Sequence, residues 1–206
     1  DMIFMDIPYD TPAIKGWNRW RSYDLISVEY FDKLMSNIRN MVKDDNTPIY
    51  HMYSKAPSWR KKMQQYNAVI EKYWFKPVAF WWRQKLFQNW KPVTNVRWVV
   101  AEPEWIALYT LNWEFNDKDI RNLDFVLQRP KGLTEKPVEL LTSLIKQWSN
   151  PWDLLLDPFA WSWPAVEAAL QEWRNIIVSE ISETQAQKII NRTQNFNTEL
   201  SPWKKE

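Results

Sequence analysis

Glycine is almost absent from this chain, and its scarcity limits the turns that the backbone can make. Two glycines occur in 206 residues, whereas the usual share of about 7% predicts about 14. Glycine adopts positive φ at the lowest cost, and tight turns and helix ends often need positive φ. Tryptophan is in excess by a similar amount, with 16 residues. The chain must therefore avoid such turns or make them with residues that fit them poorly.

Many of the tryptophans stand among neighbours that are typical of turns. They are Trp74 in KYWF, Trp90 in QNWKP, Trp113 in LNWEF, Trp152 in NPWD, and Trp161 and Trp163 in FAWSW. Our hypothesis is that many of these residues are glycine in the cellular protein, because the gene uses UGA as a glycine codon and the printed sequence reads it as tryptophan. The alternative is a protein that is truly rich in tryptophan. Some tryptophans, such as Trp148 on an apolar helix face, are expected to be genuine.

The composition also excludes several kinds of site. No cysteine is present, which excludes disulfides and thiolate metal sites, and we expect no metal. The single histidine, His51, lies in the strand-like segment TPIYHMYS, where we expect a structural residue and not a catalytic base. No apolar stretch approaches the roughly 18 residues of a membrane span, and no signal peptide is visible. We therefore expect a cytoplasmic protein without a membrane partner, whose strand-like start, DMIFMD, indicates that earlier elements are missing.

Strand-like and helix-like patterns alternate along the chain, which is typical of an α/β fold. Strands are predicted at 2–5, 47–54, 76–82, 104–111, 153–157 and 175–180. Helices are predicted at 27–42, 58–73, 136–148, 164–173 and 182–190, the last one opened by a capping box of Ser182 and Gln185. This order predicts one domain over 1–206, with a mostly parallel sheet and helices on both faces.

Positive charge is concentrated in the middle of the chain. Residues 55–98 contain ten basic residues and one acid, a net charge of +9, although the whole chain carries +2. A basic segment with interleaved aromatic residues is typical of nucleic-acid binding. The candidate DNA contacts are Lys61, Lys62, Arg83 and Lys85. The alternative is a helix face that is merely solvated.

The segment LLLDPFAWSWPAVEAAL, residues 154–170, predicts a strand, a tight corner and a helix, and the next strand ends at Glu180. In open α/β sheets, ligands bind at the carboxyl ends of strands. A turn without side chains lets the ligand approach the backbone, and an acid after the next strand binds ribose hydroxyls. The spacing therefore suits a nucleoside-binding βαβ unit, although a purely structural corner would have the same pattern.

A second candidate site directly follows the first predicted strand, in the tetrapeptide Asp6-Ile7-Pro8-Tyr9. The carboxylate of Asp6 and the carbonyl of Ile7 could accept hydrogens from an exocyclic amino group, and Tyr9 could stack on the ring. This arrangement suits an enzyme that acts on a flipped base. Asp and Pro are also common in turns, so the tetrapeptide alone is a weak signal.

Together, DIPY, TEKPVELLTSLI, DPFAWSW and SEIS, in that order, resemble the β-group amino-methyltransferases, which methylate adenine N6 or cytosine N4 in DNA. The resemblance covers nearly the whole chain and is strongest over 134–192. It implies the Rossmann-like fold of methyltransferases that use S-adenosylmethionine (SAM), with a permuted motif order and a truncated N-terminus. The catalytic-motif half would be 1–54, the basic target-recognition region 55–133, and the SAM-binding half 134–206.

The resemblance also implies roles for individual residues. It makes Asp6, Ile7, Pro8 and Tyr9 the catalytic tetrapeptide, with Ile7 in place of the family's first proline. The cofactor site would consist of Lys136, Pro137, Asp157, Phe159, Ala160, Trp161, Ser162, Trp163 and Glu180. The family pattern has glycine where Trp152, Trp161 and Trp163 stand, which agrees with the recoding hypothesis. Pro164 replaces the family's threonine.

The implied reaction is methyl transfer from SAM to an exocyclic amine of double-stranded DNA. An Asp at the first position of the tetrapeptide favours adenine N6 over cytosine N4. A restriction endonuclease or a second copy of the chain could be a further partner, as in restriction-modification. Two alternatives stay open: a catalytically inactive DNA-binding remnant, and a methyltransferase that acts on RNA or on a protein amide nitrogen.

Overall fold

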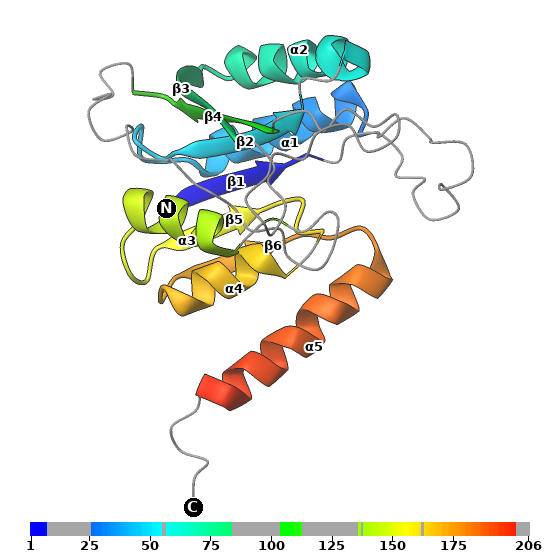
Figure 1. Ribbon diagram of the computed structural model, residues 1–206. Helices are drawn as coiled ribbons and strands as arrows, with labels where there is room; N and C mark the ends of the chain where they lie inside the picture. Colours follow the sequence, from blue (N-terminus) through cyan, green and yellow to red (C-terminus); the bar gives the residue numbers. More distant parts are fainter. Residues whose placement is uncertain are drawn as a thin grey trace, which may run out of the picture. The chain divides into compact units, whose positions relative to one another are not determined.

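The computed structural model describes residues 1–7, 26–54, 57–83, 104–112, 136, 138–161 and 163–200, without the side chains of 53–61, 79–83, 104–105 and 197–200. Strands and helices alternate along the chain, except that β4 follows β3 with no described helix between them (Figure 1). The strands are β1 Met2–Asp6, β2 Ile49–Ser54, β3 Lys76–Arg83, β4 Glu104–Thr110, β5 Leu154–Asp157 and β6 Asn175–Val178. The helices are α1 Val28–Met41, α2 Pro57–Lys72, α3 Val138–Trp148, α4 Pro164–Gln171 and α5 Glu183–Leu200.

The strands form one mixed sheet in the order β3-β4-β2-β1-β5-β6. β1 and β5 are parallel, with Met2 opposite Leu155, and β5 and β6 are parallel, with Asp157 opposite Val178. β4 runs antiparallel to both of its neighbours, β2 and β3. The prediction of an α/β fold is confirmed, and the expected parallel pairing is found on the β5 side of the sheet.

β4 is antiparallel to its two neighbours in the sheet, and the sequence did not predict this. Because β2 and β3 both oppose β4, they run in the same direction as each other, as a βαβ unit through α2 requires. β4 lies between them, so the crossover skips one position in the sheet. Strand periodicity alone carries no information on direction, which is why the sequence did not reveal this insertion.

The chain divides into two compact units. The first consists of Asp1–Phe4 and Leu127–Glu206, and the second of Met5–Val126. In the first unit, buried side chains of α3 (Leu140, Leu141, Leu144, Ile145) and α4 (Val166, Ala168, Ala169) contribute to the core together with Leu155 of β5. In the second unit, α1 packs on α2, with the rings of Phe31 and Tyr66 4.8 Å apart.

Two helices begin as the sequence predicts. Ser27 is the N-cap of α1, and its hydroxyl accepts a hydrogen bond from the backbone N–H of Tyr30 at 3.0 Å. Ser182 caps α5, and its hydroxyl accepts from the N–H of Gln185 at 3.4 Å. α5 continues to Leu200, ten residues beyond the predicted end at 190. None of the described helices is both long and apolar enough to cross a membrane.

Candidate functional site

The corner after β5 is tied to the end of the neighbouring strand by backbone hydrogen bonds. The N–H of Ser179 donates to the carbonyl of Asp157 at 2.9 Å, and the N–H of Ala160 donates to the carbonyl of Ser179 at 3.0 Å. The buried carboxylate of Asp157 accepts the N–H of Phe159 at 3.0 Å. Asp157 therefore holds the first turn of the corner, and the corner lies beside the segment that carries Glu180.

Glu180 follows β6 and is half-buried. One of its carboxylate oxygens accepts the backbone N–H of Ser182 at 2.7 Å. That bond orients the carboxylate between the end of β6 and the start of α5. A carboxylate fixed beside a strand-to-helix corner is an acceptor suited to the two hydroxyls of a ribose.

Trp161 and Trp163 differ in backbone conformation. Trp161 has φ of 30°, in the left-handed region that favours glycine. Trp163 has φ of −57° and ψ of −29°, which is right-handed helical geometry, and it precedes Pro164 at the start of α4. Its buried ring meets the ring of Phe196 edge-on at 5.9 Å. Positive φ is therefore found at Trp161 and not at Trp163, because Trp163 is the N-cap residue of α4 and already has right-handed helical geometry.

The remaining residues predicted for the cofactor site lie partly outside the described residues. Phe159 and Ala160 are buried, and Ala160 belongs to a core cluster with Val166 and Ile189. Lys136 is buried and precedes α3 by two positions. Pro137 and Ser162 lie outside the described residues.

The base-site tetrapeptide is described only in its first half. Asp6 is the last residue of β1 and is half-buried, and Ile7 is buried with 2% of its surface exposed. The carboxylate and the carbonyl that could accept an amino group thus come at a strand end, as predicted. Pro8 and Tyr9 lie outside the described residues.

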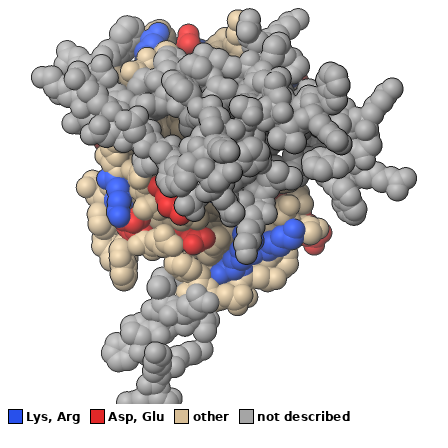
Figure 2. All heavy atoms as spheres, viewed as in Figure 1, with Lys and Arg blue, Asp and Glu red and all other residues tan. Residues whose placement is uncertain are grey.

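The predicted DNA contacts fall on α2 and β3. Lys61 and Lys62 lie in α2, and the ammonium of Lys62 is 5.4 Å from the centre of the Tyr66 ring. Arg83 ends β3, and Lys85 lies outside the described residues. On the face drawn in Figure 2, the described residues carry interspersed basic and acidic side chains. DNA binding by these residues stays a prediction.

One cation of the basic segment has a structural role. The ammonium of Lys72 pairs with the carboxylate of Asp32 at 2.8 Å and joins α2 to α1. The hydrogen bond with Lys72 lowers the pKa of Asp32, and the same bond raises the pKa of Lys72. Lys72 is therefore engaged in the fold and is a poor candidate for contact with a phosphate.

His51 is a core residue of β2. It is fully buried, burial lowers its pKa to about 3, and a hydrogen bond with Asn67 opposes that shift. A neutral imidazole enclosed between a strand and a helix does not reach a substrate. Within the described ranges, no group of three or more His, Asp or Glu side chains could hold a metal ion.

The sequence did not indicate Trp173, which is one of four described residues with positive φ and has φ of 62°. The predicted helix ran through residue 173, but α4 ends at Gln171. The polar stretch from Gln171 to Asn175, between an alanine-rich helix and an apolar strand, was the available signal for an earlier end.

Comparison with known proteins supports the fold. No family model and no curated sequence matches the chain. The structure of M1.HpyAVI in complex with SAM has 20% identity and a TM-score of 0.62, over 93% of this chain and 88% of its own. TTHA0409 from Thermus thermophilus, assigned as a DNA modification methylase, has 16% identity and a TM-score of 0.65. The match covers 98% of this chain and 88% of the TTHA0409 chain. The chain has the fold of DNA methyltransferases.

A third solved structure has the same fold. The PvuII DNA methyltransferase, which is cytosine-N4-specific, has 15% identity and a TM-score of 0.53, over 94% of this chain and 85% of its own. The methyltransferase fold predicted from the ordered motifs is thus confirmed. The permuted motif order and the missing first elements stay predictions.

Proposed function

We propose that this chain is a SAM-dependent DNA methyltransferase that modifies an exocyclic amino group. The observation that carries the proposal is the corner of the first unit, where Asp157 holds the turn after β5 and Glu180 follows the adjacent parallel strand. The methyltransferase fold adds independent support, since solved structures with that fold include complexes with SAM. A corner of this kind at the carboxyl ends of parallel strands is where open α/β sheets bind nucleotides.

The residues of the corner fit the nucleoside part of SAM by their chemistry. Glu180 would accept hydrogen bonds from the ribose hydroxyls, and the turn from Asp157 to Ala160 would offer its backbone to the ligand. Lys136, which precedes α3, belongs to the motif that the family resemblance places over the methionine part. When bound, SAM supplies an electrophilic methyl group.

The base site would position the amine for attack on that methyl group. Asp6 and the carbonyl of Ile7 would accept its two hydrogens and direct the nitrogen lone pair toward the methyl carbon, while Tyr9 would stack on the base. Positioning and hydrogen bonding would carry most of the rate enhancement. Because the tetrapeptide begins with Asp, we propose adenine N6 as the target.

Double-stranded DNA is the proposed substrate. The +9 segment over residues 55–98 supplies the charge to contact phosphates, with Lys61, Lys62, Arg83 and Lys85 as the proposed contacts. We also propose a partner endonuclease or a second copy of the chain as a further partner, and only the family resemblance supports this part. We also propose that some positions printed as tryptophan are glycine in the cellular protein, because the cell translates their codons as glycine.

The reaction is tested with the chain carrying Trp161→Gly, incubated with SAM and unmethylated double-stranded DNA. Nucleosides from the digested DNA are then analysed by mass spectrometry, and N6-methyladenine is the expected product. N4-methylcytosine alone would overturn the choice of base. SAM binding without any product on DNA, with product on RNA or protein instead, would favour the open alternative.

Asp6→Ala is the matched test of the base site. It should abolish transfer and leave SAM binding within about twofold, because it removes an acceptor for the target amine and not a contact to the cofactor. Asp45→Ala, at an exposed carboxylate between α1 and β2, is the control and should keep full activity. Loss of SAM binding in Asp6→Ala would contradict the assignment.

A further inference from the structure

Four described residues have φ in the left-handed region, and all four are tryptophan. They are Trp74 (φ 71°), Trp152 (76°), Trp161 (30°) and Trp173 (62°). Tryptophan makes up 16 of 206 residues, so chance placement would rarely select it four times. β-Carbon sterics make positive φ costly for a bulky side chain, and glycine is the usual occupant.

Trp173 occupies the position after a helix where a left-handed residue is characteristic. The N–H of Trp173 donates to the carbonyl of Leu170 at 3.2 Å, and the N–H of Arg174 donates to the carbonyl of Ala169 at 2.8 Å. With Glu172 as the C-cap, these two bonds form a Schellman motif whose left-handed residue is Trp173. That residue is usually glycine.

Trp74 ends α2 in a similar way. The N–H of Trp74 donates to the carbonyl of Glu71 at 3.0 Å, and the buried Phe75 follows. This hydrogen bond and the left-handed φ again place the tryptophan at the first position beyond the helix cap, where glycine ends helices.

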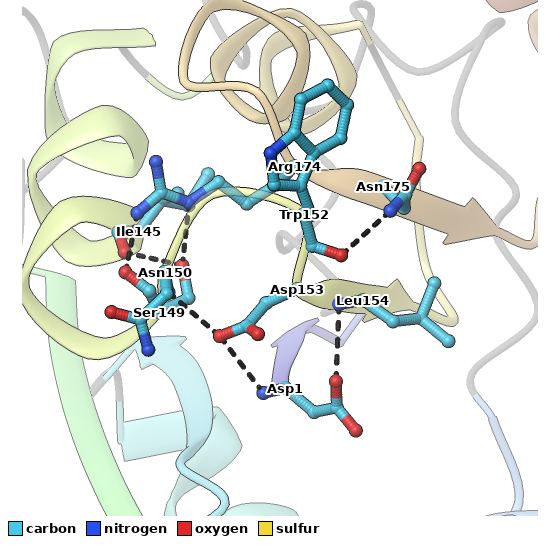
Figure 3. Close-up of polar contacts among 9 residues, drawn as sticks. All are labelled: Asp1, Ile145, Ser149, Asn150, Trp152, Asp153, Leu154, Arg174 and Asn175. Carbon is cyan, nitrogen blue, oxygen red and sulfur yellow. Dashed lines mark hydrogen bonds and ion pairs between the residues drawn. The ribbon is translucent and has the colours of Figure 1, made fainter.

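Trp152 occupies the third position of a β-turn. The N–H of Asp153 donates to the carbonyl of Asn150 at 3.1 Å, which closes the turn Asn150-Pro151-Trp152-Asp153. A proline in the second position with positive φ in the third is the pattern of a type II turn, which calls for glycine in the third. Figure 3 shows that the carbonyl of Trp152 is held by the side-chain amide of Asn175, at 2.8 Å.

The backbones of Trp152 and Trp173 are anchored, but their indoles are not enclosed. The N–H of Trp152 donates to the carbonyl of Trp173 at 2.7 Å, while the two residues are 71% and 67% exposed. Trp74 is 70% exposed. The indoles of Trp152 and Trp173 contact each other on the surface, with ring centroids 6.1 Å apart, but neither is buried. At these three turns backbone hydrogen bonds accompany the left-handed conformation and the indole lies exposed, which is an environment that suits glycine.

We propose that Trp74, Trp152, Trp161 and Trp173 are glycine in the cellular protein, encoded by UGA codons that its host reads as glycine. The geometry makes no such assignment for Trp163, which is right-handed and buried. This inference specifies which positions are affected and adds Trp173 to those that the sequence indicated. For Trp161 its consequence rests on the proposed function, since a glycine there would open the corner to SAM.

The test compares glycine and alanine at the same positions. Alanine removes the indole but keeps the β-carbon, so only glycine relieves a strained left-handed backbone. Trp74→Gly, Trp152→Gly and Trp173→Gly should each raise the melting temperature of the chain by roughly 2–4 °C or more. The matched alanine variants should show a smaller gain or a decrease. Equal melting temperatures for the glycine and alanine series would overturn the proposal.

Trp148→Gly is the control, because Trp148 is half-buried within α3. It should lower the melting temperature, because it removes a half-buried side chain from the last residue of α3, whose φ is not in the left-handed region. The codons provide the direct check: UGA is expected at 74, 152, 161 and 173, and UGG at any of these would overturn the assignment there.

A calorimetric titration of Trp161→Gly with SAM tests the SAM site independently of the recoding. Absence of binding there, with stabilisation at the other three sites, would count against the SAM site and leave the recoding intact.

Discussion

At the scale of single residues, the conformation of the backbone distinguishes positions that the residue types alone do not. Trp161 and Trp163 look equivalent in the sequence, as two indoles in one short corner. The structure gives them opposite signs of φ and places only Trp163 in the core. Sequence patterns identified the corner, but its hydrogen bonds reach Ser179, just after β6, which is a neighbour in space that a local pattern does not include.

His51 provides a test of stability against pH at the residue scale. Its pKa is about 3 in the folded chain and about 6.5 when unfolded. Above pH 6.5 the imidazole is neutral in both states and the stability is fully present. As the pH falls from 6.5 towards 3, only the unfolded chain gains a proton, so about 3 kcal/mol of stability should be lost between pH 7 and pH 4.

Urea denaturation at several pH values measures this decrease. In His51→Gln, which removes the titrating group and can still hydrogen-bond Asn67, the slope between pH 7 and pH 4 should become distinctly flatter. An unchanged slope would show that other groups dominate the acid sensitivity.

At the scale of secondary-structure elements, local signals were most reliable where a cap or an apolar stripe was present. The predicted helix 27–42 corresponds to α1 Val28–Met41, because Ser27 caps its start and Phe31, Met35 and Ile38 form its buried face. The second half of α5 was missed because its residues beyond Ile190 are mostly polar. The insertion of β4 between β2 and β3 was missed because pairing partners are distant in sequence.

The cap of α1 can be tested by two substitutions at one position. Ser27→Ala removes the acceptor for the N–H of Tyr30 and should lower the free energy of unfolding by about 1 kcal/mol, within a range of roughly 0.5–2. Ser27→Asp keeps an acceptor at the helix N-terminus and should retain most of the stability. Denaturation monitored by circular dichroism measures both variants. Equal destabilisation by the two substitutions would mean that the hydroxyl contributes through something other than capping.

At the scale of the whole molecule, the order of motifs predicted the fold, and the solved methyltransferase structures confirm it. The surface that contacts the substrate was harder to predict from the sequence. Charge counted along the sequence does not show where side chains point or what they pair with. Lys72 is one of the ten cations of the basic segment, and it pairs with Asp32.

DNA binding is therefore best tested through its salt dependence. Changing Lys61, Lys62 and Arg83 to Gln should weaken binding and reduce the slope of log K against log [salt] by up to about 0.9 for each phosphate that is no longer neutralised. Lys33→Gln, on the exposed surface of α1, should leave the slope unchanged. If the triple variant kept the full slope, the basic segment would be a solvated surface.

We propose that the corner after β5 binds SAM, with Glu180 as an acceptor for the ribose. Isothermal titration of SAM into the Trp161→Gly chain tests it directly, with and without Glu180→Gln. Hydrogen bonds to a charged group contribute about 1.5–3 kcal/mol, so Glu180→Gln should raise the Kd at least about tenfold. Glu183→Gln, at an exposed carboxylate in the first turn of α5, should change it less than about twofold. Equally tight binding with Glu180→Gln, or no binding by the Trp161→Gly chain itself, would contradict this assignment of the SAM site.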